Sequence, residues 1–323
     1  MKQEQKISNG VKRIKTILMG TSEFAETIFK RTYPELKDKL EIITIITAPD
    51  KPVGRKQEPL PSPVKKWAEE NRLPVLQPQK IRDSEWIKKI QELNPDLIIL
   101  CAYGQIVPKE ILEIPKYGAL NIHPSLLPKY RGASPVHAAI LNGDKISGVT
   151  IMLMDEEMDH GPILASTKLQ ITNSQTYKQL SDELADLGAK LLINTLPDWV
   201  DGKIKVKTQD HSKASFCKII KKQDGKIDWD KSAEEIERTI RAFHQWPTSY
   251  TFFNNKQLKV LGADTKEGKI KKPSEVFTEN KELMVQTGNG ILILKQIQLE
   301  GKKPMSDQDF LNGHPEIIGS SLQ

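Results

Sequence analysis

The sequence has few cysteines and no long apolar run. Its two cysteines, Cys101 and Cys217, lie 116 residues apart (217 minus 101), without another Cys or His at metal-ligand spacing. This argues against a disulfide framework and a zinc site, and it indicates a reducing compartment. The longest apolar run, 97–102, is far too short to span a bilayer, and residues 1–12 lack the apolar core of a signal peptide. We therefore expect a cytoplasmic protein that does not associate with membranes.

Motifs for nucleotide and metal chemistry are also missing. Only Gly20 follows the first apolar run, so the Gly-x-Gly-x-x-Gly fingerprint of nicotinamide-binding proteins is incomplete. The sequence contains neither a Gly-x-x-x-x-Gly-Lys-Ser/Thr loop nor a His-Glu-x-x-His motif. We expect no nicotinamide cofactor, no nucleotide hydrolysis and no catalytic metal.

The length of 323 residues predicts two domains and is enough for a sizeable core. Hydrophobic residues at 37% and charged residues at 28% are typical of a folded, non-membrane protein. The net charge of +6 permits a polyanionic partner without requiring one.

In the first part of the chain, short β-branched or apolar runs alternate with helical patterns. Such alternation predicts right-handed crossovers and a Rossmann-like, doubly wound, mostly parallel sheet. A first helix begins near Thr21 or Ser22. The remaining predicted strands and helices are, in chain order, strands 16–19 and 41–48, helix 64–71, strand 75–77, helix 83–93 and strand 96–102.

The same domain continues to a long amphipathic helix. A strand at 118–123 is followed by a helix at 134–141, and strands 149–154 and 163–169 flank a loop containing Asp159. Leucines at three-to-four spacing predict a helix over 176–196. We place the catalytic domain at residues 13–200.

Candidate catalytic residues stand at the end of the 118–123 strand. The period of two places Asn121 and His123 on one face. An amide donor and a titratable imidazole suit acyl transfer, in which a carbonyl oxygen becomes anionic, and Asp159 could orient the imidazole. The alternatives are a hydrogen-bonded structural histidine and a turn aspartate before Gly161.

Taken together, Asn121-x-His123, the Ser125-Leu126-Leu127-Pro128 loop and Asp159, 38 positions after Asn121 (159 minus 121), resemble the 10-formyltetrahydrofolate-dependent formyltransferases. The resemblance implies that 10-formyltetrahydrofolate is the formyl donor. It also implies that Asn121, His123 and Asp159 are catalytic, and that the donor contacts Ser125, Leu126, Leu127 and Pro128. The Leu127–Pro128 bond is a candidate for the cis form.

A proline-rich basic loop separates the second strand from its helix. Residues 49–63 contain Lys51, Arg55 and Lys56, and their prolines predict a loop without regular structure. The loop resembles the insertion with which methionyl-tRNA formyltransferases grip the acceptor arm, and Arg55 matches that family's loop arginine. The alternative is a basic surface loop without a ligand.

A basic linker follows at 201–212. Lys203, Lys205 and Lys207 alternate with apolar residues, which predicts three cations on one side of an extended segment. One interpretation is a solvated strand edge that the lysines protect from aggregation. The second is a surface that binds tRNA phosphates.

The last region, 213–323, also resembles the methionyl-tRNA formyltransferases, through residues 218–229, a helix at 233–242 and residues 246–251. Predicted strands at 256–261, 283–286 and 291–297, the last two joined by a Gly288-Asn289-Gly290 turn, form a small antiparallel barrel. The resemblance implies an OB-like domain that binds tRNA.

These resemblances imply a monomeric enzyme of translation initiation that formylates the amino group of methionyl initiator tRNA. Three features depart from the pattern of the tRNA formyltransferases. Pro124 stands where they more often have Ala and His160 where they often have Thr, and the Gly161-Pro162-Ile163 run looks more like glycinamide ribonucleotide formyltransferase. The long C-terminal region argues against that purine enzyme. A nucleotide-sugar formyltransferase and a noncatalytic RNA-binding protein are further possibilities on the same fold.

Overall fold

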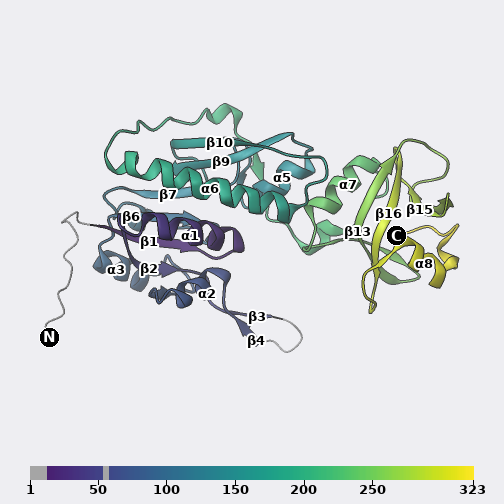
Figure 1. Ribbon diagram of the computed structural model, residues 1–323, viewed down its shortest axis with the longest axis horizontal. Coiled ribbons are helices and arrows are strands. Elements are labelled where there is room, and N and C mark those ends of the chain that lie inside the picture. The colour runs from purple at the N-terminus through teal and green to yellow at the C-terminus, as the bar shows by residue number, and fades with distance from the viewer. Residues whose placement is uncertain (1–12, 54–57) are drawn as a thin grey trace, which may run out of the picture. The chain divides into compact units, whose positions relative to one another are not determined.

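The computed structural model describes residues 13–53 and 58–323, and its elements are labelled in Figure 1. Contacts divide the chain into two compact units. No helix in these two described ranges is long and apolar enough to cross a membrane. The first unit contains Met1–Ala133, Gly148–Leu169 and Ser181–Phe216, and the second contains Ser134–Ser147, Gln170–Leu180 and Cys217–Gln323.

A seven-stranded, mostly parallel sheet organises the first unit, as predicted. Its strand order is β10-β9-β7-β6-β1-β2-β5. β1 pairs in parallel with β2 and β6, β6 pairs in parallel with β7, and β9 runs antiparallel to β7. The strands are β1 (Ile14–Gly20), β2 (Leu40–Ile46), β5 (Val75–Leu76), β6 (Leu97–Cys101), β7 (Ala119–His123), β9 (Ile146–Leu153) and β10 (Ile163–Gln170).

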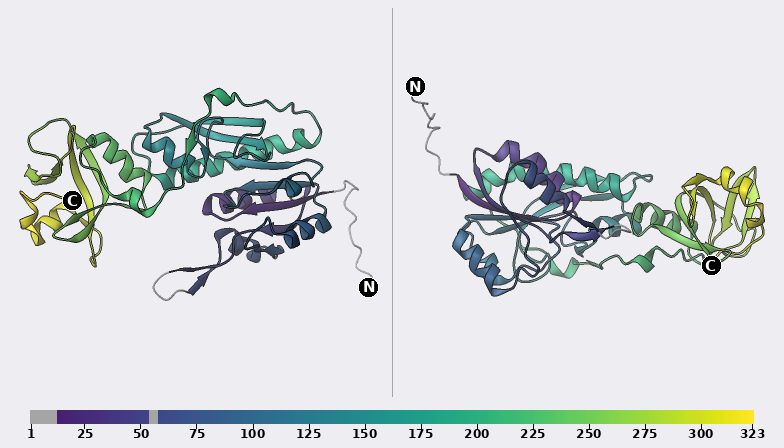
Figure 2. Two further views of the ribbon diagram at one scale, coloured as in Figure 1. Left: turned by 180° about the vertical axis from the view of Figure 1, so that it is seen from behind. Right: turned by 90° about the horizontal axis from the view of Figure 1, so that it is seen from below.

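Helices cover both faces of this sheet (Figure 2). Ile17 and Met19 of β1 pack into a cluster that contains Ile90 of α3, whereas all five residues of β6 and of β7 are buried. A strand buried on both faces reads as a continuous apolar run, which is why β6 was recognisable in the sequence. The helices are α1 (Glu23–Leu36), α2 (Pro63–Glu70), α3 (Ser84–Leu93), α4 (Lys109–Leu112) and α6 (Tyr177–Val200).

The prediction that residues 49–63 lack regular structure was wrong. Strands β3 (Lys51–Val53) and β4 (Glu58–Leu60) form an antiparallel pair in which Pro52 lies opposite Pro59. Alternate residue pairs of an antiparallel ladder exchange no hydrogen bonds, so two facing prolines cost the ladder nothing. Because each proline lies opposite the other, the two short strands can pair although both contain proline.

The second unit contains an antiparallel sheet in the order β12-β13-β16-β15-β14, with β17 beside β16. Helix α7 spans Ala233–Ala242, as predicted, because Ser232 and Glu235 form a capping box at its start. The other elements are β12 (Ser249–Phe253), β13 (Lys256–Lys266), β14 (Val276–Glu279), β15 (Glu282–Gln286), β16 (Ile291–Leu299), β17 (Met305–Ser306), α5 (Pro135–Leu141) and α8 (Asp307–Gly313).

The last residues of the chain join the two edges of this antiparallel sheet. The Val276 amide of β14 donates to the Ser320 carbonyl at 2.9 Å, and the Phe252 amide of β12 donates to the Gln323 carbonyl at 3.0 Å. Leu322, between these bonds, is buried in the core of the unit. The tail thus closes the sheet into the predicted small barrel, which removes both exposed edges.

Candidate active site

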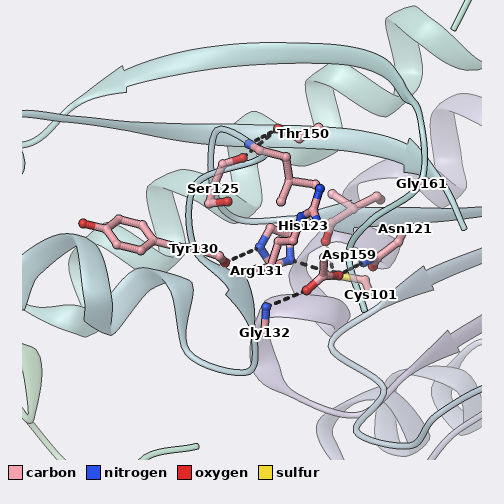
Figure 3. Close-up of polar contacts among 12 residues, drawn as sticks. Cys101, Asn121, His123, Ser125, Tyr130, Arg131, Gly132, Thr150, Asp159 and Gly161 are labelled. Carbon is pink, nitrogen blue, oxygen red and sulfur yellow. Dashed lines mark hydrogen bonds and ion pairs between the residues drawn. The ribbon is translucent and has the colours of Figure 1, made fainter. Parts of the chain in front are cut away.

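Strand β7 ends in the two candidate catalytic residues. Asn121 and His123 are buried, at 7% and 4% exposure, because β7 lies between β6 and β9. The Asn121 Nδ2 donates to Asp159 Oδ1 at 3.1 Å, and His123 Nδ1 lies 3.6 Å from the same oxygen (Figure 3). The fold therefore brings together the three residues that the sequence singled out.

The Asp159 carboxylate is fixed by neighbours on both oxygens. Its Oδ2 accepts a 2.7 Å hydrogen bond from the Gly132 amide, in the two-residue strand β8 (Arg131–Gly132). Asp159 has a φ of +50°, in the left-handed region that few residues other than glycine occupy. Gly161 packs so closely that a Cβ there would lie 1.9 Å from the Leu153 carbonyl oxygen. Asp159 is therefore a turn residue, and its carboxylate also contacts the candidate catalytic residues.

The hydrogen bonds of His123 define its tautomer. Its Nε2 lies 2.9 Å from the Tyr130 carbonyl oxygen, and a carbonyl can only accept, so Nε2 carries a hydrogen. Nδ1 is left facing Asp159. With Nε2 engaged by the carbonyl, Nδ1 is the nitrogen suited to proton exchange.

The 125–128 loop is built against β9. The Ser125 hydroxyl donates to the Lys129 carbonyl at 2.5 Å, while the Thr150 hydroxyl donates to the Ser125 carbonyl at 2.7 Å and accepts from the Leu127 amide at 3.2 Å. The Leu127–Pro128 bond is cis. Ser125 and Leu127 are buried, and Leu126 and Pro128 are half-buried. The loop therefore has a defined shape beside His123.

Cys101 lies behind the site at the end of β6. Its thiol donates to the Ile122 carbonyl, 3.7 Å away, and burial raises the pKa of this thiol. A thiolate is the nucleophilic form of cysteine, so this cysteine is a packing residue and not a nucleophile.

Sequence reasoning missed two residues that reach the Asp159 loop. The Gln209 Nε2 donates to the carbonyl oxygens of Asp159 and Gly161, at 2.9 and 2.7 Å. The Arg131 guanidinium donates twice to Gln209 Oε1, at 3.2 and 2.7 Å. Arg131 is 78 positions from Gln209, and no local pattern in the sequence indicates that they meet.

His160 belongs to a polar cluster. Its ring stacks on His211, with centroids 4.0 Å apart and planes 8° from parallel. The His160 Nδ1 lies 2.7 Å from Asp155 Oδ2, and the Arg131 guanidinium donates to His211 Nδ1 at 2.8 Å. These contacts connect the Asp159 loop to the segment that follows α6.

The predicted tRNA-binding residues come from two other segments of the chain, 49–63 and 201–212. Lys51 is exposed in β3, whereas Arg55 and Lys56 fall outside the described residues. The Lys203 ammonium is 2.7 Å from Asp201 and 3.4 Å from Asp198. Lys205 and Lys207 are exposed, and the backbone of Lys207 exchanges two 2.8 Å hydrogen bonds with Ile163 of β10.

Within residues 13–53 and 58–323, no group of three or more His, Cys, Asp or Glu side chains is arranged to hold a metal ion. The side chains around Asp159 are instead engaged with one another by the hydrogen bonds above. The donors and acceptors present suit proton transfer and oxyanion binding.

Two family models match the chain. The one described as formyl transferase matches residues 12–196, more than half of the chain, and the one described as formyl transferase, C-terminal domain, matches residues 219–315. The chain belongs to the formyl transferase family, which confirms the family resemblance predicted from the sequence.

Within that family, similar relatives are methionyl-tRNA formyltransferases. The chain is 42% identical to the one from Clostridium novyi over 316 residues, covering 96% of this chain and 100% of the relative. It is 41% identical to the one from Bacillus velezensis over 300 residues, covering 92% and 94%.

Solved structures share the fold at lower identity. An N-formyltransferase from Helicobacter canadensis, in complex with folinic acid and dTDP-3-aminofucose, is 21% identical, with a TM-score of 0.62 over 87% of this chain and 99% of that chain. HypX from Aquifex aeolicus, in complex with tetrahydrofolic acid, is 17% identical, with a TM-score of 0.62 over 95% and 48%. At these identities the likeness shows the fold alone.

Proposed function

We propose that this chain transfers the formyl group of 10-formyltetrahydrofolate to the amino group of methionyl initiator tRNA. The observation that carries the proposal is the contact of Asn121 and His123 with one carboxylate oxygen of Asp159. The relatives that match almost the whole chain, C-terminal region included, support tRNA as the acceptor.

In this reaction a neutral amine attacks the formyl carbon, whose oxygen becomes anionic. Asn121 uses one amide hydrogen to bind Asp159, and its second Nδ2 hydrogen remains to bind the oxyanion. A proton on His123 Nδ1 adds a second donor beside the Asp159 carboxylate. Both groups are buried, and in a water-poor site such donors stabilise charge more than they would in water.

Completion of the transfer requires one proton to move. The bond between the formyl carbon and N10 of the folate breaks, and the attacking amine loses a proton as N10 gains one. Asp159 accepts the amine proton, directly or through water, and returns it toward N10. The Gly132 and Asn121 donors hold the carboxylate still during this exchange.

The remaining predicted residues serve the two substrates. The loop from Ser125 to Pro128 contacts the folate beside His123. Lys51, Arg55 and Lys56, together with Lys205 and Lys207, contact tRNA phosphates, and Arg55 adds a planar donor fork for the acceptor arm. Lys203 contributes less, because two carboxylates already surround its ammonium. The protein acts as a monomer in the cytoplasm.

The test supplies 10-formyltetrahydrofolate with a labelled formyl group and offers three acceptors in parallel. These are charged initiator tRNA, glycinamide ribonucleotide and a dTDP-linked amino sugar. We expect label on the methionyl-tRNA alone, and none with uncharged tRNA as the control. Label on glycinamide ribonucleotide or on the sugar, but not on the tRNA, would contradict the proposal in favour of that acceptor. Binding of tRNA without transfer to any acceptor would favour a noncatalytic RNA-binding protein.

A further inference from the structure

The Asp159 loop is bonded to a residue fifty positions further along the chain. Gln209 is 5% exposed and lies in the extended segment that follows α6. Its Nε2 donates to the Asp159 and Gly161 carbonyls, which lie on either side of residue 160. One amide thus uses both of its hydrogens to hold the two peptide groups that set the course of the loop.

The orientation of the Gln209 amide is determined by Arg131. A guanidinium only donates, so the atom that receives its two hydrogen bonds must be the glutamine oxygen. The glutamine nitrogen then faces the two carbonyls, which only accept. Arg131 is 4% exposed, so its bonds are not in competition with bulk water.

The loop needs such support because Asp159 has a left-handed backbone. A φ of +50° costs free energy for a residue with a Cβ and persists only where the surroundings enforce it. Arg131 and Gly132 are neighbours in β8. One orients the glutamine that binds the Asp159 main chain, and the other donates to the Asp159 side chain. The two contacts fix main chain and carboxylate together.

We propose that Gln209 is a positioning residue for Asp159, and that Arg131 acts through Gln209 by orienting its amide. The inference rests on the proposed function, in which Asp159 moves a proton. Gln209 lies in the 201–212 linker, so the inference also gives this linker a role in catalysis. Lys207, two residues before Gln209, pairs with Ile163 at the start of β10 and holds the linker beside the sheet. Loss of Gln209 then lowers kcat, while the binding of the folate is unchanged.

The test compares Gln209→Ala with Gln209→Glu in the full-length protein. The glutamate keeps the size of the side chain but, when ionised, has no hydrogen to donate to the two carbonyls. We expect both variants to lower kcat about 10- to 100-fold, since small misplacement of a catalytic group has effects of this size. The KM for 10-formyltetrahydrofolate should stay within about twofold of wild type. A Gln209→Glu variant with normal kcat would mean that packing alone matters and would overturn the proposal, as would normal kcat in Gln209→Ala.

A double variant that combines Gln209→Ala with Asp159→Asn provides a second test. If Gln209 acts through Asp159, adding Gln209→Ala to Asp159→Asn should reduce kcat by no more than about twofold further. A full multiplicative loss in the double variant would show that the two residues act independently and would overturn the proposal.

A measurement without substrate separates this inference from the proposed function. Amide hydrogen exchange over residues 156–162 should accelerate in Gln209→Ala. The matched control is Gln286→Ala, a fully buried glutamine of the second unit whose Nε2 also donates to a backbone carbonyl, that of Gly290 at 2.8 Å. That variant should leave exchange over 156–162 unchanged. If wild-type protein formylated no tRNA, the proposed function would fail, and faster exchange in Gln209→Ala alone would still support the positioning role. Unchanged exchange in that variant would overturn it.

Discussion

At the scale of single residues, the site depends on one carboxylate with four restraints. Asp159 receives Asn121 on Oδ1 and the Gly132 amide on Oδ2, lies beside His123 Nδ1, and has its main chain bonded to Gln209. Charged groups that are buried in this way stabilise a fold only when their partners are complete. The same restraints hold the carboxylate in one orientation, and proton transfer requires such a fixed orientation.

His123→Ala is expected to reduce turnover about a hundredfold or more, the range for a lost general acid-base group. It should also lower the free energy of unfolding by about 1–3 kcal/mol, because the buried Tyr130 carbonyl loses the Nε2 donor. Single-turnover kinetics and thermal unfolding measure the two effects. His314→Ala, at a histidine of the second unit, is the control and should keep normal turnover. Activity of His123→Ala within a fewfold of wild type would show that the imidazole is structural.

At the scale of elements, helix α5 carries a histidine in aromatic surroundings. His137 stacks on Tyr177, with ring centroids 4.0 Å apart, and lies 6.2 Å from the ring of Phe243. Burial lowers the pKa of His137 to about 4, below its ordinary value of about 6.5. The helix is therefore packed around a neutral imidazole, and protonation opposes that packing.

The pH dependence of stability follows from this shift. Between pH about 6.5 and about 4 the unfolded chain binds a proton that the folded chain does not, so stability is lost as the pH falls through this range. The limiting slope for one such group is about 1.4 kcal/mol per pH unit. His137→Phe keeps an aromatic ring and should flatten the decline. Urea unfolding of both proteins at a series of pH values measures it, and parallel curves would show that His137 does not contribute.

At the scale of the whole molecule, the two edge strands of the second unit depend on the tail. Residues 319–323 bond to β14 and β12, and Leu322 fills the core between them. The barrel is therefore complete only when the end of the chain is in place.

Leu322→Ala should destabilise the second unit by about 2–4 kcal/mol, the cost of a cavity at a buried leucine. The matched control is Ile318→Ala, four residues earlier, where the side chain is 48% exposed and little should change. Denaturant unfolding followed by tryptophan fluorescence reports the effect, because Trp229 belongs to the same core. Equal effects of the two variants would mean that the tail does not support the barrel.

Salt dependence tests the linker lysines at the same scale. Lys205→Ala should lower the slope of log affinity for tRNA against log salt by about one unit, equally for initiator and elongator tRNA, because phosphate contacts are blind to sequence. Lys203→Ala should change the slope less, since Asp198 and Asp201 already neutralise that ammonium. Filter binding at several salt concentrations measures both slopes. A larger effect at Lys203 would contradict this assignment.

Local patterns in the sequence determined much of this architecture. The start of α7 follows from its capping box, and the shared face of Asn121 and His123 follows from the two-residue period of a strand. Both properties belong to stretches of a few residues, so neighbours along the chain are enough to specify them. Asp159 was singled out by the family resemblance, because it lies 38 positions after Asn121 (159 minus 121) and no local pattern links the two.

Only the tertiary structure decided which distant groups meet. The pairing of Pro52 with Pro59, the closure of the barrel by Leu322 and its neighbours, and the bond between Gln209 and the Asp159 loop each depend on register or on the path of the chain. A buried carbonyl accepts from whatever donor the fold brings within about 3 Å, and no local pattern names that donor. The chemical types at the site can thus be predicted from the sequence, whereas the contacts that hold them are set by long-range packing.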